Sequence, residues 1–143
     1  MTIIELSKIS TLNKSNIIKF LMIFVGFSGC FSVLFGAWLA HAGQLYTVDV
    51  QSSLKTALQY QLFHTLALFV ALVWAIMNLA DNKLSKILLA ACISFLLGIV
   101  LFSGGIYIKT FFSFSIVGKL TPFGGISLAV AWLLLAFEGK NNL

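Results

Sequence analysis

The chain alternates four long apolar segments with short polar connections. Apolar residues dominate at about 17–40, 54–80, 86–108 and 120–138. A bilayer core roughly 30 Å thick needs about 20 residues of helix to cross it. Each segment is long enough for one crossing. The pattern therefore predicts an all-α integral membrane protein, built as a bundle of four transmembrane helices.

The start of the chain has a different character. Residues 1–16 are rich in Ser, Asn and Lys, which predicts a flexible or surface-lying tail before a single membrane domain at 17–138. Ala40, His41 and Ala42 have the A-x-A form of a signal-peptide cleavage site. However, the apolar part of a signal peptide runs for only about 7–15 residues, and this segment is longer. We therefore expect a retained first helix.

The charges predict how the chain sits in the membrane. Only 9% of the residues are charged, the net charge is +5, and all nine basic residues are lysines. Six lysines fall on the side that carries both chain ends and three on the other, so the positive-inside rule predicts cytoplasmic termini. The absence of Arg argues against nucleic-acid binding, because Arg makes the bidentate contacts that read bases. The expected partners are the lipid bilayer and either further copies of the chain or another membrane protein.

Small residues recur on one face of each apolar segment. Helices in lipid associate through small residues that let their backbones approach closely. The positions expected at helix–helix contacts are Gly29, Ser32 and Gly36 in the first segment, Ser94, Gly98 and Gly105 in the third, and Gly124 and Gly125 in the fourth.

Polar side chains gather near the start of the second segment. Steps of four and three place Gln61 and His64 on one row with Ala57, which we expect to face the bundle; Tyr60 suits the membrane interface. His41 ends the first segment toward the same membrane face. Three readings are open: hydrogen bonds to neighbouring helices, haem ligation by two imidazoles or contact with a quinone, and a path for protons or a small solute. The first is preferred, with His64 buried and bonded across the bundle together with Gln61.

Motifs of soluble enzymes are absent from the sequence. It has neither a P-loop nor a GxSxG motif, and its four acidic residues fall in tails, in connections or at the ends of apolar segments. Cys30 and Cys92 lie inside apolar segments without a CxxC spacing, which favours buried thiols over a disulfide. The sequence therefore predicts no catalytic residue, no metal and no resident cofactor.

Four motifs occur in order along the chain: GAWLAHAG at 36–43, KTALQYQLFHTLAL at 55–68, LFSGGIY at 101–107 and GKLTPFGG at 118–125. With them, the chain from about 20 to 137 resembles the YgdD/YwdK-like family of small bacterial inner-membrane proteins, which has eukaryotic transmembrane relatives. The resemblance implies a multi-pass protein of the inner (plasma) membrane and no particular reaction, because the family has no established activity. His41, Tyr60, Gln61 and His64 fall on family motif positions. Trp38 and Leu39 depart from the Phe-Gly pair of the family's first motif.

Together these features predict an uncharacterised small inner-membrane protein, non-enzymatic and either an accessory or a membrane-structural component. The alternative is a haem- or quinone-binding redox subunit, and the third hypothesis is a small-solute conductor.

Overall fold

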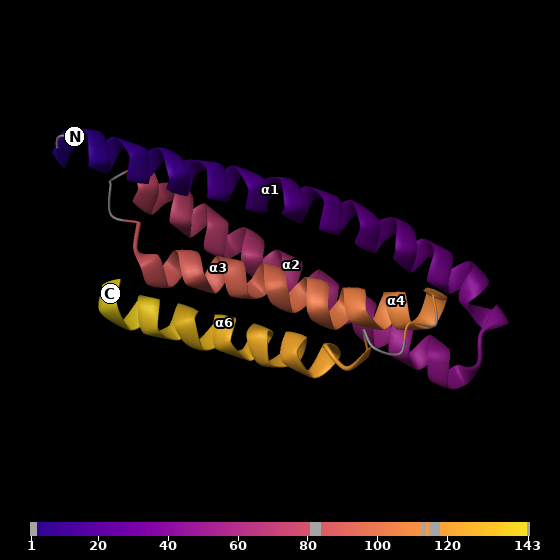
Figure 1. Ribbon diagram of the computed structural model, residues 1–143. Helices are drawn as coiled ribbons and strands as arrows, with labels where there is room; N and C mark the ends of the chain where they lie inside the picture. Colours follow the sequence, from indigo (N-terminus) through magenta and orange to yellow (C-terminus); the bar gives the residue numbers. More distant parts are fainter. Residues whose placement is uncertain (1–2, 81–83, 113, 115–117, 143) are drawn as a thin grey trace.

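The computed structural model is built from long helices joined by short connections (Figure 1). It describes residues 3–80, 84–112, 114 and 118–142. In chain order the elements are α1 (Ile3–Ala42), the 3-10 turn η1 (Gly43–Leu45), α2 (Val48–Ala80), α3 (Lys86–Ile99), the π-helix η2 (Val100–Gly104), α4 (Gly105–Phe112) and α6 (Thr121–Asn142).

Four stretches of the described residues are helical, long and apolar enough to cross a membrane: Leu12–Leu45, Val48–Leu79, Lys86–Phe112 and Thr121–Lys140. The third stretch contains α3, η2 and α4, which follow one another without a break. The four-helix membrane architecture expected from the hydrophobic pattern is therefore present.

The N-terminal segment differs from the expected flexible tail, because α1 already begins at Ile3. Neither Gly nor Pro occurs before Gly26, so nothing in this segment interrupts a helix. The Lys14 ammonium donates a hydrogen bond to the Leu84 carbonyl, with 3.1 Å between Nζ and the oxygen. This bond ties the first helix to the connection just before the third.

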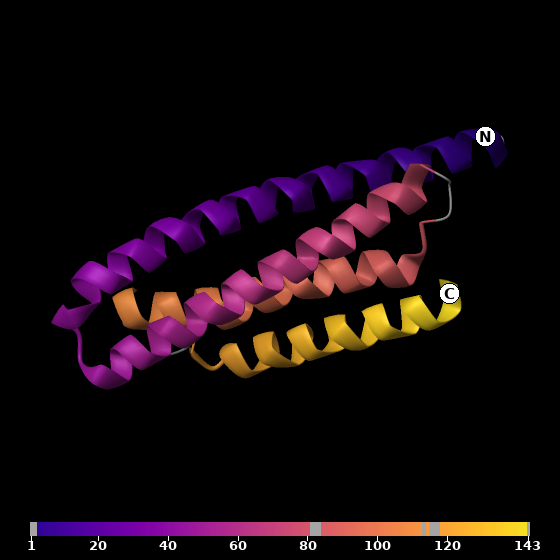
Figure 2. The ribbon, with the colours of Figure 1, turned by 180° about the vertical axis from the view of Figure 1, so that it is seen from behind.

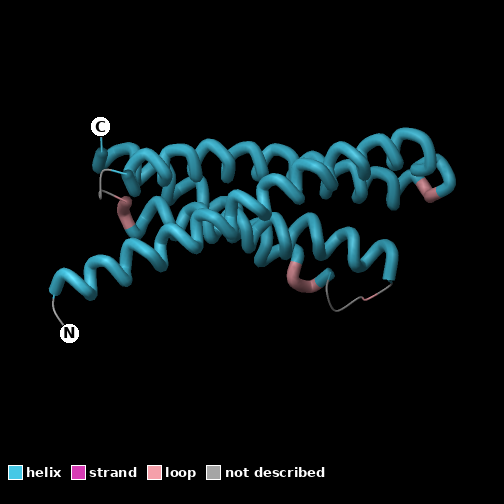
Figure 3. Tube along the Cα trace, turned by 90° about the horizontal axis from the view of Figure 1, so that it is seen from above, coloured by secondary structure: helices cyan, strands magenta, loops and turns pink. Residues whose placement is uncertain are grey.

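The helices lie as an open row in which each packs mainly on its neighbours in sequence. Figures 1 and 2 show α1 and α6 on opposite sides of the pair formed by α2 and α3, and Figure 3 shows the same helices from above. Both chain termini lie at the same end of the molecule, as four crossings require. Which side of the membrane this end faces stays a prediction from the lysines.

The apolar core follows α3 and the helices on either side of it. Leu88, Cys92 and Phe95 are fully buried and belong to one cluster with residues of α1, α2 and α6. A smaller cluster around Phe35, Leu39 and Leu54 joins α1 to α2 near the opposite end. Large apolar side chains are exposed on the outside of the bundle, as expected for surfaces that face lipid.

Candidate functional site

A network of polar side chains crosses the bundle, and Gln61 of α2 lies at its centre. Gln61 is buried, with 6% of its surface exposed. Its Nε2 donates to the hydroxyl and to the carbonyl oxygen of Ser28 in α1, at 3.1 and 3.3 Å. Its Oε1 accepts from the Tyr107 hydroxyl of α4 at 3.0 Å. One amide therefore joins three helices and uses both of its donors.

The α1 side of this network is bonded further. The Ser28 and Thr65 hydroxyls form a hydrogen bond of 2.7 Å between α1 and α2. Ser32 is also buried and donates from its hydroxyl to the Ser28 carbonyl at 2.8 Å. Burying these groups without partners would cost free energy, so their mutual bonding fixes the register of α1 against α2.

A second set of contacts surrounds the π-helix η2, where the backbone turn is wider than in an α-helix. The buried Ser103 hydroxyl donates to the Ala57 carbonyl of α2 at 2.8 Å. On the opposite side, α6 comes close enough that a Cβ on Gly124 would lie 2.4 Å from the backbone nitrogen of Phe102. Only a glycine fits there without moving one helix, so Gly124 sets the separation of α6 and η2.

The other positions expected at helix contacts differ in how closely they pack. A Cβ on Gly98 would meet the Leu128 side chain at 2.4 Å, and one on Gly36 would lie 3.4 Å from Leu58. Gly105 is buried, the Ser94 carbonyl accepts a hydrogen bond from Ser127 at 2.8 Å, and a Cβ on Gly125 would touch Phe102 only at 3.8 Å.

Gly29 contradicts the expectation. No atom lies within 4 Å of where its Cβ would be, so it faces outward and does not pack on α2. The inward face of α1 at this level is taken by its neighbour Ser28, whose hydroxyl is bonded to Thr65 and Gln61.

His64 also differs from its prediction. Its Nδ1 lies 2.7 Å from the Tyr60 carbonyl of its own helix, and because a carbonyl only accepts, Nδ1 carries the proton of this bond. Its ring lies among aromatic side chains, 6.1 Å from Phe95 and 6.3 Å from Trp132 between centroids. The bond across the bundle is made instead by Thr65, one residue later in the chain. His64 is therefore a half-buried residue at the edge of the helix contact.

The two histidines are not brought together. His64 lies beside Thr65, which contacts Ser28, while the exposed His41 follows Ser28 by 13 residues along α1. At a rise of 1.5 Å per residue this offset is roughly 20 Å, too far for both imidazoles to bind one haem iron. Among the described residues, no group of three or more His, Cys, Asp and Glu side chains is placed to hold a metal ion.

Tyr60 lies on the outer surface of α2, and its expected place at the membrane interface stays a prediction. Its side chain is 42% exposed, and its ring stacks on Phe102 at 4.5 Å between centroids. Tyr60 and His64 line one wall of a shallow groove of about 440 Å³, together with Phe63 and Trp132. Gln61 and Ser28 lie instead at the base of a separate groove of about 310 Å³, between α1 and the third span.

One buried acidic residue was not singled out by the sequence pattern. Glu138 in α6 is only 2% exposed and accepts a hydrogen bond of 2.6 Å from the Ser85 hydroxyl. Ser85 in turn caps α3 by accepting from the Leu88 backbone nitrogen at 3.0 Å. The sequence spacing could have predicted its burial, because Glu138 follows Gly124 and Ala131 at intervals of seven residues and therefore shares their inward face.

Comparison with known proteins agrees with this architecture. The model of a family described as "Protein of unknown function (DUF423)" matches residues 35–125, which include Gln61, Thr65, Ser103, Tyr107 and Gly124. A "UPF0382 membrane protein" of Haemophilus influenzae is 36% identical over 114 residues, covering 79% of this chain and 87% of the relative. The chain belongs to this family.

Two further relatives place the family in the membrane. The "UPF0382 inner membrane protein YgdD" of Escherichia coli strain K12 is 32% identical over 82% of this chain and 86% of its own length. The "UPF0382 membrane protein YwdK" of Bacillus subtilis is 38% identical over 62% of this chain and 68% of its own length. No solved structure matches the chain. The protein is thus a multi-pass inner-membrane protein of an uncharacterised family.

Proposed function

We propose that this protein is a non-enzymatic accessory component of the inner membrane, which presents a rigid four-helix frame to another membrane chain or to a second copy of itself. The observation that carries the proposal is the bonding of the polar network. Gln61 uses both amide donors within the protein, and among the described residues no buried side-chain nitrogen or oxygen lacks a partner. A reactive site needs groups whose bonding capacity is free for a substrate, whereas these groups hold helices together.

The outward face of α1 is where such a partner would approach. Gly26 and Gly29 have open space where a Cβ would be, and Cys30 beside them is exposed. Small residues on a lipid-facing surface allow a second helix to come close to the backbone. Within the protein these glycines have no packing role, so contact with a partner would explain their place.

Purification in a mild detergent from membranes of the native host tests this proposal. The wild type should retain a companion membrane chain, or a second copy, in a fixed ratio. Replacing Gly29 with Leu should remove the companion, whereas the control Met77→Leu, at an exposed position of α2, should keep it. A single copy without a companion in all three preparations would contradict the proposal.

The second candidate, a redox subunit, rests on His64 alone. With Nδ1 donating to the Tyr60 carbonyl, the neutral imidazole has its Nε2 lone pair available at a groove lined by aromatic residues, and ligand histidines are commonly held in this way. A Soret band in the purified wild type that disappears in His64→Leu would favour this candidate over the first. A spectrum without absorbance above 300 nm, which lies beyond the protein's aromatic absorption, would count against a haem.

A further inference from the structure

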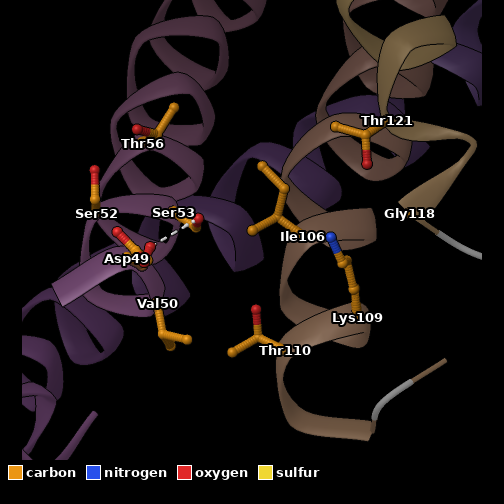
Figure 4. Close-up of a pocket in the computed structure, with 10 residues that line it drawn as sticks. All are labelled: Asp49, Val50, Ser52, Ser53, Thr56, Ile106, Lys109, Thr110, Gly118 and Thr121. Atoms are coloured by element: carbon orange, nitrogen blue, oxygen red, sulfur yellow. Dashed lines mark hydrogen bonds between the residues drawn. The ribbon is translucent and has the colours of Figure 1, made fainter. Parts of the chain in front are cut away.

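A polar cavity lies at the end of the molecule opposite the termini. It measures about 570 Å³ and is bounded by the beginning of α2, by α4, by Gly118, and by Thr121 at the start of α6 (Figure 4). Hydroxyl-bearing side chains supply much of the lining: Ser52, Ser53, Thr56, Thr110 and Thr121. Its volume falls within the range of roughly 300–1,000 Å³ that is typical of small-ligand sites.

The cavity carries one charge of each sign on facing walls. Figure 4 shows Asp49 on the α2 side and Lys109 on the α4 side. Among the described residues no ion pair joins Asp49 and Lys109, and Figure 4 shows their side chains apart across the cavity, so both charges can meet a ligand between them. Gly118 allows Lys109 its position, because a Cβ at Gly118 would lie 2.9 Å from the Lys109 Cδ.

Two long helices begin at this cavity. Asp49 is in the first turn of α2, which has 33 residues, and Thr121 is the first residue of α6, which has 22. The first turn of a helix carries a partial positive charge. Some of its backbone N–H groups are already used here, because Gln51 and Gly124 donate to the Thr47 and Leu120 carbonyls and Pro122 has no N–H. Together with the Lys109 ammonium, this environment favours a phosphate group, while the Asp49 carboxylate favours an ammonium group.

The position of the cavity indicates where such a ligand comes from. The second and fourth spans begin at Val48 and Thr121, and the third ends at Phe112, so the cavity lies at the level where the protein leaves the apolar core. Phospholipid head groups occupy this level of a bilayer. Phe111 and Phe112, exposed at the end of α4, are of the aromatic type found at this boundary.

We propose that this cavity binds the phosphoethanolamine head group of a phospholipid, with its phosphate at Lys109 and the helix starts and its ammonium at Asp49. The two charges of the head group match the two charged walls. Hydroxyls of the lining other than that of Ser53, which donates to the Asp49 carbonyl, bond to the phosphate oxygens. A lipid with a phosphate but no ammonium, such as phosphatidylglycerol, satisfies only the Lys109 wall. The site therefore selects phosphatidylethanolamine.

The test is a titration of the full chain, purified in mild detergent and depleted of lipid, with phosphatidylethanolamine or phosphatidylglycerol in mixed micelles. The thermal unfolding midpoint reports binding. The wild type should bind phosphatidylethanolamine about tenfold more tightly, since a charge-assisted hydrogen bond changes affinity by about this factor. Asp49→Asn should abolish the preference, whereas Lys109→Gln should weaken both lipids about tenfold.

Two further variants serve as controls for the effect of charge at the cavity. Lys55→Gln removes an exposed lysine of α2 that does not line the cavity, and it should leave both affinities unchanged. Gly118→Ala moves the Lys109 side chain without removing its charge, so it should weaken both lipids by less than Lys109→Gln and gives a second test of the lysine wall. An absent lipid preference in the wild type, or a preference that survives Asp49→Asn, would overturn the proposal.

Soluble glycerophosphoethanolamine distinguishes the source of the head group, because it has the same charges without acyl chains. It should bind at least about tenfold more weakly than the lipid, since it cannot use the apolar surface around the cavity. Equal affinity would assign the cavity to a water-soluble solute and overturn the lipid proposal.

Discussion

Replacing Gln61 with Leu removes the centre of the polar network and keeps a side chain of similar size. Three hydrogen bonds are lost, two to Ser28 and one from the Tyr107 hydroxyl. The Ser28–Thr65 bond stays, but the Tyr107 hydroxyl loses its partner in α2. The variant therefore separates the contribution of the Gln61 amide from that of the surrounding apolar contacts.

The expected loss follows from measured hydrogen bonds in membrane proteins, which contribute about 0.6 kcal/mol on average and at most about 1.7 kcal/mol. Three bonds of average strength give a loss of about 2 kcal/mol in the free energy of unfolding. The unpaired Tyr107 hydroxyl adds to this loss, because Tyr107 is partly buried. A change of this size is well outside the effect of a typical surface substitution.

The assay is reversible unfolding in mixed micelles, with Gln59→Leu as the matched control. Gln59 is exposed on the same helix, two residues earlier, so its replacement should change stability by less than about 0.5 kcal/mol. A double-mutant cycle with Tyr107→Phe should give a coupling energy of about 0.6–1.7 kcal/mol. Equal losses in Gln61→Leu and Gln59→Leu, or a coupling near zero, would refute the reasoning.

The remaining predictions concern packing, His64 and topology. Gly124→Ala should destabilise the fold by about 1–3 kcal/mol, since the new Cβ would meet backbone atoms of η2. The control Gly139→Ala has open space around it and should not destabilise the fold. Thermal unfolding in detergent compares the two variants. His64→Gln and His64→Leu should differ little in the same assay, because the His64 bond stays within its own helix; a clear advantage of Gln would contradict this. Cysteine at Thr47 should react with a membrane-impermeant thiol reagent in intact cells and cysteine at Thr2 should not; the reverse would invert the orientation.

The hydrophobic pattern was sufficient to predict four membrane helices, because lipid requires every span to satisfy its backbone hydrogen bonds within itself. It did not reveal that α1 reaches back to Ile3, because this segment mixes Leu6, Ile9 and Leu12 with Ser, Asn and Lys and is not a continuous apolar run. The π-helix η2 was also beyond reach from the sequence. Its wide turn coincides with tertiary contacts: the Ser103 hydroxyl donates a hydrogen bond to α2, and Gly124 of α6 packs closely against the Phe102 backbone.

The candidate site was only partly predictable for a geometric reason. Gln61 lies at the middle of the inward face of α2, so any helical period places it inside. His64 and Thr65 flank the same face one turn later, and a repeat of 3.5 residues favours His64. The structure buries Thr65, whose small hydroxyl reaches Ser28, and leaves the larger imidazole at the edge among aromatic rings. The choice between neighbours on a helix edge depends on the opposing helix, which periodicity does not describe.

The central claim is that the polar groups of the spans bond to one another and hold the helices in register. Disulfide cross-linking in native membranes tests it most directly, with Ser28 and Thr65 both changed to Cys in a chain whose Cys30 and Cys92 are replaced by Ala. Because the two hydroxyls lie 2.7 Å apart, mild oxidation should join this pair and remove both free thiols. The control pair of Ser28→Cys with Leu66→Cys should stay reduced, since Leu66 is exposed on the outer surface of α2. Efficient cross-linking of the control pair, or a Thr65 pair that stays reduced, would contradict the account.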